Sequence, residues 1–411
     1  MSLRPLRIIV IGGGAAGFFG AIAAARTNPL AQVILLEASQ QVLAKVRVSG
    51  GGRCNVTHAC FEAKGLVQNY PRGSKALLGA FARFQAQDTV NWFGRNGVSL
   101  KTEPDGRMFP ITDSSETIID CLMDSAKSAG VDVCVGTPVV LVKQLDASFE
   151  VVVKSGDKLE CDRILIATGS NPLGYKIAQG FGHTVEKPVP SLFTFNIRDE
   201  QLRDLAGVSV NPVKLRLTVP DYPQLEQMGP LLITHWGLSG PAVLKLSAWG
   251  ARMLHEKQYQ AKLSVNWLPQ LSQDEVRQKL LALKEEVPKR ALALHRGFDL
   301  PHRLWQYMVS RVEIPPETRW TELSKKHLNL LVQELSQGQY SVNGKGVFKD
   351  EFVTCGGVNL KEINFKTMES KLVPGLYFAG EVLDIDGVTG GFNFQSAWTT
   401  AYLAGLAMGQ S

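Results

Sequence analysis

The sequence lacks the features of a protein that is stabilised by disulfides or metal ions or that is strongly basic. Its six cysteines form no CxxC pair and no Cys/His cluster with zinc spacing, and they stand at positions 54, 60, 121, 134, 161 and 355. We therefore expect reduced thiols, no bound metal and a cytoplasmic location. The net charge of +6 arises from 44 basic and 38 acidic residues, and no basic run exceeds Lys289-Arg290 or Lys325-Lys326. Such dispersed charge neither demands nor excludes an RNA partner.

Long apolar runs are also scarce. Residues 8–25 carry no charge and follow Arg4 and Arg7, as in a signal peptide or a membrane helix. Three consecutive glycines at 12–14 interrupt this stretch and argue against both interpretations. No other stretch is a candidate, so we expect no membrane partner.

Length and composition indicate a globular protein of several domains. At about 150 residues per domain, 411 residues correspond to two or three domains. Hydrophobic residues make up 45% of the chain and charged residues 20%, which is typical of a folded chain rather than a disordered one.

The first 37 residues predict a strand, a glycine turn, a helix and a second strand. Residues 6–11 form a β-branched apolar run, Gly12 to Gly17 open a helix that extends to about Ala25, and residues 32–37 form the next strand. This second strand ends in Glu37, which lies 20 residues beyond Gly17. The order is that of a βαβ unit that binds a dinucleotide.

The glycine spacing matches the dinucleotide fingerprint. Gly12 allows the tight turn, Gly14 allows the backbone to approach a pyrophosphate, and Gly17 allows close packing of helix on strand. Glu37 is placed to accept the hydroxyls of an adenosine ribose, and an acid there disfavours a 2′-phosphate. The pattern therefore predicts FAD or NAD rather than NADP.

Two further glycine-rich segments favour FAD over NAD. Residues 49–57 combine three glycines with Arg53, which is suited to a phosphate or substrate, and Asn55, which is suited to a heteroaromatic edge. Residues 380–393 follow a predicted strand at 375–379 and precede a helix. Exposed amides there would stabilise negative charge on a reduced flavin, and the acids at 381 and 386 would bind ribityl hydroxyls.

These elements predict an α/β protein with a discontinuous Rossmann-type FAD-binding domain. We expect this domain at residues 1–190 and 356–411. A β-rich substrate domain occupies 191–270 and 339–355, because short apolar runs alternate there with proline and glycine. A small helical insert occupies 271–338, where residues 272–275 predict a helix N-terminus.

The chain resembles the HI0933-like family of bacterial FAD-dependent oxidoreductases. The motifs that carry the resemblance are IGGGAAG (11–17), SGGGRCN (49–55), DGRMFP (105–110), THWGLSGPA (234–242), GGV (356–358), TMESK (367–371) and GLYFAGEVLDIDGVTGGFNFQSA (375–397). The resemblance implies a split Rossmann-type FAD domain, a β-rich domain and a small helical domain.

The motifs and the resemblance together give a set of expected FAD-binding residues. These are Gly12, Gly13, Gly14, Ala15, Ala16, Gly17, Glu37, Lys45, Arg53, Cys54, Asn55, Val139, Ala167, Thr168, Gly169, Gly380, Glu381, Asp386, Gly391 and Asn393. No single catalytic residue is identified, and the candidates are Arg53, Asn55, Arg107, His235 and Asn393.

We expect an FAD-dependent oxidoreductase that transfers a hydride through the flavin N5 and reduces a C=C bond of a small or ring substrate. One alternative is reduction of uridine to dihydrouridine in ribosomal RNA, and others are an amine or ketone oxidase and a non-enzymatic flavin redox sensor. No second GxGxxG follows the first, so NADH or NADPH would act as a transient electron donor. The oligomeric state is left open.

Several residues admit two interpretations. Cys54 and Cys60 form a redox dithiol or are structural. His235 is an acid–base group or part of a turn before Pro241. Trp305, Tyr307 and Trp320 are core residues or an RNA-stacking platform. Five other histidines are expected to be surface or packing residues: His58, His255, His295, His302 and His327.

Overall fold

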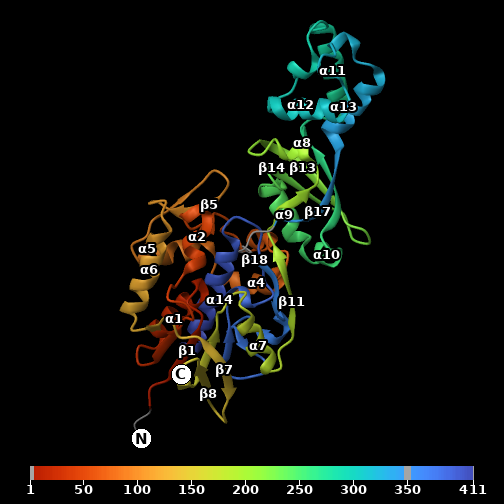
Figure 1. The fold of residues 1–411 in the computed structure, drawn as a ribbon. Helices are drawn as coiled ribbons and strands as arrows, with labels where there is room; N and C mark the ends of the chain where they lie inside the picture. Colours follow the sequence, from red (N-terminus) through yellow and green to blue (C-terminus); the bar gives the residue numbers. More distant parts are fainter. Residues whose placement is uncertain (1–3, 347–352, 411) are drawn as a thin grey trace. The chain divides into compact units, whose positions relative to one another are not determined.

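The computed structural model describes residues 4–346 and 353–410 (Figure 1). The chain divides into two compact units. Unit 1 contains Met1–Pro188 and Val353–Ser411, and unit 2 contains Val189–Phe352. The chain leaves unit 1 along β11 (Val185–Ser191) and returns along β18 (Val353–Val358), and these two strands pair with each other.

A seven-stranded sheet forms the centre of unit 1, in the order β19-β20-β21-β10-β1-β2-β6. In that order the strands are Ile363–Asn364, Glu369–Ser370, Leu376–Phe378, Arg163–Ile166, Arg7–Ile11, Gln32–Leu36 and Asp132–Cys134. The five strands from β21 to β6 are parallel. Because β1 lies between β10 and β2 and is covered on both faces, its sequence is an uninterrupted apolar run.

Two helices of small residues pack closely in unit 1. Helix α1 (Ala15–Thr27) follows the first glycine turn, and α14 (Phe392–Gly409) follows the last. A Cβ atom added to Gly405 of α14 would lie 2.5 Å from the Cβ of Ala23 and 2.5 Å from the carbonyl oxygen of Gly20. The absence of side chains at these glycines lets the two backbones approach.

The other helices and sheets of unit 1 carry the candidate site residues. The helices are α2 (Ala44–Gly52), α3 (Ala63–Leu66), α4 (Ser74–Phe81), α5 (Ala86–Arg95), α6 (Ser115–Ser128) and α7 (Pro172–Gly180). One small sheet contains β3 (Thr57–His58), β5 (Arg107–Pro110) and β4 (Leu100–Thr102), in that order. A second contains β7 (Val139–Gln144), β8 (Phe149–Val153) and β9 (Lys158–Cys161).

Unit 2 is built on a closed barrel with the strand order β12-β15-β14-β13-β16-β17. In that order the strands are Phe195–Ile197, Gly237–Ser239, Leu225–Thr234, Ser209–Thr218, Gln260–Asn266 and Gly338–Lys345. Short helices α8 (Glu200–Arg203), α9 (Pro241–Trp249) and α10 (Ala251–Glu256) accompany the barrel. Alternating burial along β16 and β17 is the pattern of strands with one face on the core.

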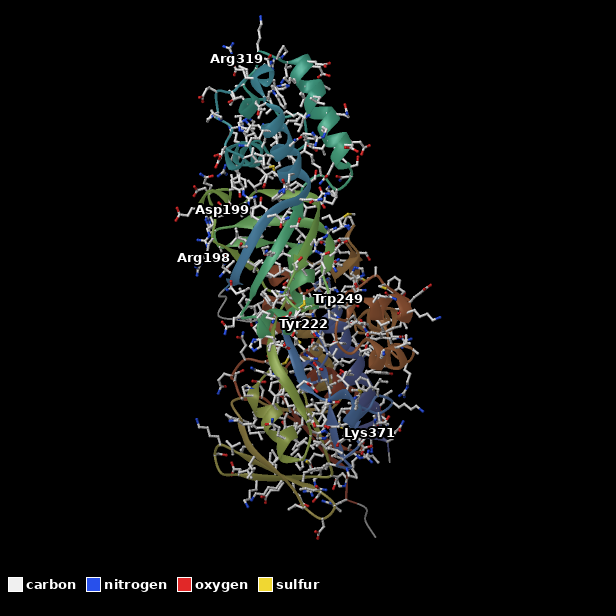
Figure 2. All side chains as sticks on the ribbon, turned by 90° about the vertical axis from the view of Figure 1, so that its right-hand side faces the viewer. Arg198, Asp199, Tyr222, Trp249, Arg319 and Lys371 are labelled. Carbon is white, nitrogen blue, oxygen red and sulfur yellow. The ribbon has the colours of Figure 1, made fainter. Side chains whose placement is uncertain are left out.

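Three helices extend unit 2 between β16 and β17. They are α11 (Gln273–Glu286), α12 (His302–Arg311) and α13 (Lys325–Gln337). Ser272 and Glu275 form a capping box at the start of α11, which confirms the predicted helix N-terminus. The apolar residues of these helices and of the barrel form one hydrophobic core. Figure 2 shows Arg319 in this helical part, and Arg198 and Asp199 beside the barrel.

The aromatic residues of the helical part belong to this core. Trp305 and Trp320 are fully buried and stack with ring centroids 6.4 Å apart, and Tyr307 is buried. The Trp305 indole donates to the carbonyl of Leu292 at 2.9 Å, and the Tyr307 hydroxyl donates to Asp199 at 2.7 Å. The alternative of an RNA-stacking platform made of these rings is therefore wrong, since the rings face the protein interior.

The predicted fold class is confirmed: a mixed α/β chain with a Rossmann-like parallel sheet and a separate β-rich region. Of the β-rich domain expected at 191–270 and 339–355, residues 347–352 lie outside the described residues. Within 4–346 and 353–410, no helix combines the length and apolar character of a membrane span. In the same part of the chain, no group of three or more His, Cys, Asp and Glu is arranged to hold a metal ion.

Gly405→Ala should destabilise the protein by about 1–3 kcal/mol, because the added methyl overlaps atoms of α1 whose backbone must move. The midpoint of urea unfolding measures this. Gly94→Ala in α5 is the matched control, since nothing lies within 4 Å of its added Cβ, and stability should stay equal or rise by up to about 1 kcal/mol. Equal effects of the two changes would contradict the packing argument.

Candidate functional site

The first glycine turn joins β1 to α1 with almost no space for side chains. A Cβ on Gly12 would overlap the carbonyl oxygen of Ala167, and one on Gly17 would overlap the carbonyl oxygen of Gly12. At Gly14, by contrast, an added Cβ would meet nothing within 4 Å. Gly14 is the N-cap residue of α1 and offers no side-chain cap. The open amides of the first helical turn, including those of Ala15 and Ala16, therefore suit a phosphate group.

Glu37 lies directly beside this turn. Its Oε2 accepts a hydrogen bond from the Gly13 amide at 2.7 Å, and its Oε1 accepts one from the Ser39 amide at 2.8 Å. The carboxylate is thus fixed at the end of β2, where a ribose hydroxyl would meet it. Val139 is buried at the start of β7, opposite Val153.

Lys45 and Glu381 connect α2 to the loop after β21. The Lys45 ammonium lies 2.6 Å from Glu381 Oε2 and 3.3 Å from the Ser170 hydroxyl. The other Glu381 oxygen accepts from the Thr354 amide at 2.9 Å. Two predicted cofactor residues lie beside Glu381. Gly380 precedes it in the chain, and a Cβ on Gly169 would lie 3.7 Å from its Oε2; both glycines are in the left-handed region.

Two buried hydroxyls near Glu381 have no hydrogen-bond partner within the described residues: those of Thr168 and Tyr175. Burial raises the pKa of Tyr175 well above its usual range, and the negative charges of Glu381 and Asp384 add to the effect. Since buried polar groups are normally paired, these hydroxyls fit a polar ligand. Together with the open Gly14 turn, they satisfy the requirements of a cofactor with phosphate and hydroxyl groups.

The SGGGRCN segment and the C-terminal glycine turn are in direct contact. α2 is kinked at Ser49, and Gly50 and Gly51 have φ values of 58° and 70°. The Asn55 side-chain amide lies between the Gly391 amide and the Thr57 carbonyl. In the orientation that satisfies both neighbours, its oxygen accepts from Gly391 at 2.9 Å and its nitrogen donates to Thr57 at 3.0 Å. A Cβ on Gly391 would lie 2.5 Å from that carbonyl oxygen. Segments far apart in sequence thus form one surface.

The structure gives Asp386 and Asn393 partners within the loop and the neighbouring helix region. Asp386 is fully buried and pairs through both carboxylate oxygens with Arg72. The Asn393 amide accepts from the Gly387 amide at 2.8 Å and donates to its carbonyl at 2.9 Å. Asp386 therefore holds the 384–393 loop and Asn393 closes it, and a contact of either residue with the cofactor stays a prediction.

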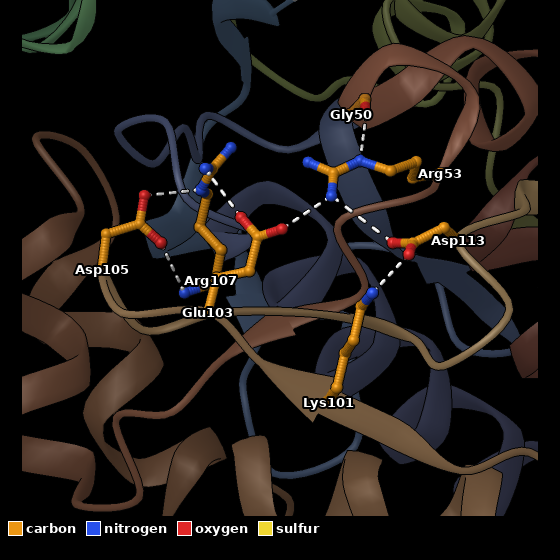
Figure 3. Close-up of polar contacts among 7 residues, drawn as sticks. All are labelled: Gly50, Arg53, Lys101, Glu103, Asp105, Arg107 and Asp113. Atoms are coloured by element: carbon orange, nitrogen blue, oxygen red, sulfur yellow. Dashed lines mark hydrogen bonds and ion pairs between the residues drawn. The ribbon is translucent and has the colours of Figure 1, made fainter.

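Arg53 and Arg107 share one carboxylate (Figure 3). Glu103 Oε1 lies 2.6 Å from Arg53 Nη1, and Glu103 Oε2 lies 2.9 Å from Arg107 Nη2. Asp105 pairs with Arg107 Nε at 2.7 Å. Asp113 lies 3.4 Å from Arg53 and also pairs with Lys101. We call these six residues the arginine cluster.

Phe109 supports both guanidinium groups. Their central carbons lie 4.0 Å (Arg53) and 5.4 Å (Arg107) from the centroid of its ring. Phe109 is fully buried on β5. Glu103 and Asp113 raise the pKa of Arg53. Lys101 and Arg53 lower the pKa of Asp113, so the pairs stay charged.

His58 links the arginine cluster to the C-terminal glycine turn, and sequence analysis missed this. It pairs with Arg107 across β3 and β5. Its ring stacks on Phe392 with centroids 4.7 Å apart, and its Nε2 lies 3.1 Å from the Asp105 carbonyl oxygen. Its position three residues after Asn55 was the only sequence signal. The buried Tyr70 hydroxyl donates a hydrogen bond to the Phe392 carbonyl at 2.6 Å, and no sequence pattern predicted this contact.

His235 occupies a turn of unit 2, between β14 and β15, and is exposed. The neighbouring Thr234 hydroxyl accepts from the Trp236 amide at 3.3 Å and donates to the Gly237 carbonyl at 3.2 Å. These contacts favour the turn interpretation, and an acid–base role for His235 stays a prediction.

The environment of Cys54 and Cys60 argues against the redox-dithiol alternative. Cys54 is fully buried, and burial raises its pKa to about 12. Burial also raises the pKa of Cys60. Since the thiolate is the reactive form, neither sulfur is prepared for exchange near neutral pH.

A Rossmann-like unit with glycine turns at both chain ends, an acid after the second strand and a barrel in a separate unit defines a class of FAD-dependent oxidoreductases. The family described as "HI0933-like protein Rossmann domain" matches residues 6–407. The chain belongs to this family of flavoproteins and is an FAD-dependent oxidoreductase.

Relatives and a solved structure agree over nearly the whole length. The chain is 32% identical over 406 residues to a ribosomal RNA dihydrouridine synthase of Escherichia coli K12, covering 96% of each chain. It is 29% identical over 409 residues to a 3-dehydro-bile acid delta(4,6)-reductase of Clostridium scindens, covering 98% of each. It shares its fold, with a TM-score of 0.51 and 12% identity over 99% of both chains, with a 3-ketosteroid delta1-dehydrogenase from Sterolibacterium denitrificans.

The buried Cys54 should make stability fall at alkaline pH. Its pKa is about 12 in the folded chain against a usual 9.0, so the unfolded chain loses the proton first. Stability from this group is complete below pH 9 and decreases by about 1.4 kcal/mol per pH unit above it. Urea unfolding between pH 8 and pH 10.5 should therefore show a shallower decline for Cys54→Ser than for the wild type.

The same variant tests the sulfur chemistry. Cys54→Ser and Cys60→Ser should retain full electron transfer through the flavin, measured by stopped-flow absorbance. Loss of electron transfer with the flavin still bound would restore the dithiol hypothesis.

Breaking the buried Arg72–Asp386 pair should cost about 3–5 kcal/mol of stability, because it leaves an uncompensated buried charge. Arg72→Met and Asp386→Leu each destabilise the chain, and the double variant should be more stable than either single one. Unfolding midpoints of the three variants measure this. A double variant as unstable as the sum of the single ones would show that the pair does not act as a unit.

Proposed function

We propose that this protein reduces a C=C bond conjugated to a carbonyl group in a ring substrate. The observation that carries the proposal is the convergence of residues 50–55 and 387–393, joined by Asn55 and Gly391, beside the two arginines of the cluster. Open amides and cations in one place suit a reaction in which negative charge develops on an oxygen.

FAD, when bound, supplies a hydride at its N5 to the substrate carbon. The residues of this chain bind and orient it. The α1 N-terminus and Glu37 would hold the pyrophosphate and ribose, and Lys45, Glu381 and the Thr168 hydroxyl would hold the groups between ribose and ring. The start of α14, shaped by Asn393, would face the pyrimidine side of the flavin with its free amides.

The names of the relatives support double-bond reduction. A dihydrouridine synthase by name saturates a uracil ring, and a 3-dehydro-bile acid delta(4,6)-reductase by name reduces double bonds of a 3-oxo steroid. In both molecules the C=C bond is conjugated to a ring carbonyl, so one hydride-transfer chemistry serves both. A small ring substrate is our first choice.

Ribosomal RNA is the second candidate substrate, and the 32% identity to the Escherichia coli enzyme favours it. The target uridine would have to leave its stack to reach the flavin. Binding of ribosomal RNA that weakens steeply with salt would support this candidate, and no binding at low salt would exclude it.

NADH or NADPH is our proposed electron donor. The sequence carries one GxGxxG only, so the nicotinamide would visit the flavin transiently rather than occupy a second dinucleotide fold.

The purified holoprotein should show a flavin spectrum that bleaches under anaerobic titration with NADH or NADPH. Addition of an α,β-unsaturated ring ketone, or of ribosomal RNA, should then restore the oxidised spectrum in stoichiometric amount. Mass spectrometry should find the acceptor two hydrogens heavier.

Two outcomes would contradict the proposal. If oxygen alone reoxidises the flavin and every unsaturated acceptor fails, the protein is an oxidase. If neither nicotinamide nor another reductant bleaches the flavin, a redox sensor fits better.

A further inference from the structure

We infer that Arg53 and Arg107 form a two-armed site for the carbonyl oxygen of the substrate, and that Glu103 is the residue that positions both arms. This rests on the proposed reduction of a conjugated C=C bond. It names the group that the site recognises and the residue that orients it.

Among the described residues, one guanidinium nitrogen of each arginine has no partner. Arg53 uses Nη1 for Glu103 and Asp113 and Nε for the Gly50 carbonyl at 3.5 Å. Arg107 uses Nη2 for Glu103 and Nε for Asp105. Arg53 Nη2 and Arg107 Nη1 have no hydrogen bond within the described ranges 4–346 and 353–410. Figure 3 shows these two nitrogens turned toward each other on the same side of Glu103.

Phe109 and Glu103 fix the positions of the Arg53 and Arg107 guanidinium groups. The buried Phe109 ring lies against both guanidinium groups, and the two oxygens of Glu103 hold one arginine each. The Glu103 side chain is 23% exposed, against 32% for Arg53 and 37% for Arg107. The carboxylate is thus less exposed than the cations that it holds, and neither arginine contributes an atom to the buried unpartnered side-chain atoms of the described residues.

The balanced charge of the cluster gives it little long-range attraction for anions. Three cations (Arg53, Lys101, Arg107) face three carboxylates (Glu103, Asp105, Asp113), so the cluster has no net charge. Attraction of an anionic substrate from a distance is therefore weak. A neutral carbonyl oxygen, by contrast, accepts two N–H bonds and gains charge only during the reaction, when those bonds strengthen.

The two arginines lie next to the C-terminal glycine turn. His58 pairs with Arg107 and stacks on Phe392, the first residue of α14. Asn55, two residues after Arg53, accepts from Gly391. The free nitrogens are therefore carried by the same strands and loop that contact the turn expected at the flavin.

The two arginines would assist the addition of a hydride and a proton to the conjugated C=C bond. A hydride from the reduced cofactor bonds to the carbon β to the carbonyl, and the C=C π pair moves to form an enolate with its charge on the oxygen. Arg53 and Arg107 donate hydrogen bonds to that oxygen. A proton from solvent then bonds to the α carbon and restores the carbonyl.

The test uses 4-nitrophenol with the FAD-loaded protein, because its phenolate resembles the enolate and its ionisation is visible. Difference spectra give its dissociation constant and its pKa when bound. The wild type should bind the phenolate and lower its pKa. Arg53→Gln and Arg107→Gln should each weaken phenolate binding by at least about tenfold and return the bound pKa toward the solution value.

Glu103→Gln separates positioning from charge. Removal of a negative charge alone would tighten phenolate binding and lower its bound pKa further. If Glu103 positions the two arginines, the same variant weakens binding despite the loss of that charge. Equal or tighter binding in Glu103→Gln would overturn the positioning role.

Lys158→Gln is the matched control for loss of one positive charge, since Lys158 is an exposed partner of Glu150 in a separate sheet of unit 1. It should change binding less than twofold. Arg53→Lys, which keeps the charge without the planar fork, should restore binding only in part. FAD content and the unfolding midpoint of each variant verify that it is folded.

The outcomes also separate this inference from the proposed function. Unchanged phenolate binding in both arginine variants, with ring-enone reduction intact in the wild type, rejects the two-armed site and leaves the function standing. Arginine-dependent phenolate binding in a wild type that reduces no conjugated C=C bond supports the site and rejects the function.

Discussion

Close approach of backbone to backbone at a few glycines is the constraint on which the rest of unit 1 depends. At Gly12 and Gly17 it brings β1, β10 and the start of α1 together, and at Gly405 it seats α14 on α1. At Gly391 it presses the C-terminal turn against Thr57. A single Cβ at any of these positions would meet main-chain atoms that cannot move alone. At these turns the surface expected to face the cofactor is therefore made of peptide groups.

How far sequence predicts such a site depends on the range of the interactions. The βαβ unit, the Ser272 cap and the three glycine turns follow from neighbours in sequence, and the structure places Glu37 beside Gly13 as its position after the strand implies. Asp386 and Asn393 belong to the same motif, but Asp386 pairs with Arg72 and Asn393 hydrogen-bonds Gly387. Local pattern gives a polar residue near the flavin and leaves open whether it faces the ligand or its own loop.

The arginine cluster shows the same limit for charge. Sequence composition gives only the dispersed net charge of +6, whereas the function depends on how a few charges are paired. Lys101, Glu103, Asp105 and Arg107 lie within seven positions on β4, β5 and their turn, yet Arg53 reaches them from another segment. The pairing neutralises the cluster as a whole and still leaves one free donor on each arginine. Local neutrality gives little attraction at a distance, and directed donors would stabilise the charge that develops on an oxygen bound between them.

The proposed site would account for a family that includes enzymes named for a ribosomal RNA and for a bile acid. A two-armed donor contacts one oxygen atom, and that atom is common to a uracil ring and a 3-oxo steroid ring. These donors would not contact the rest of the substrate, whether it is a sugar–phosphate chain or a fused ring system. Selection between such substrates therefore has to arise at surfaces away from the arginine pair, while the pair and the glycine turns supply the chemistry that the substrates share.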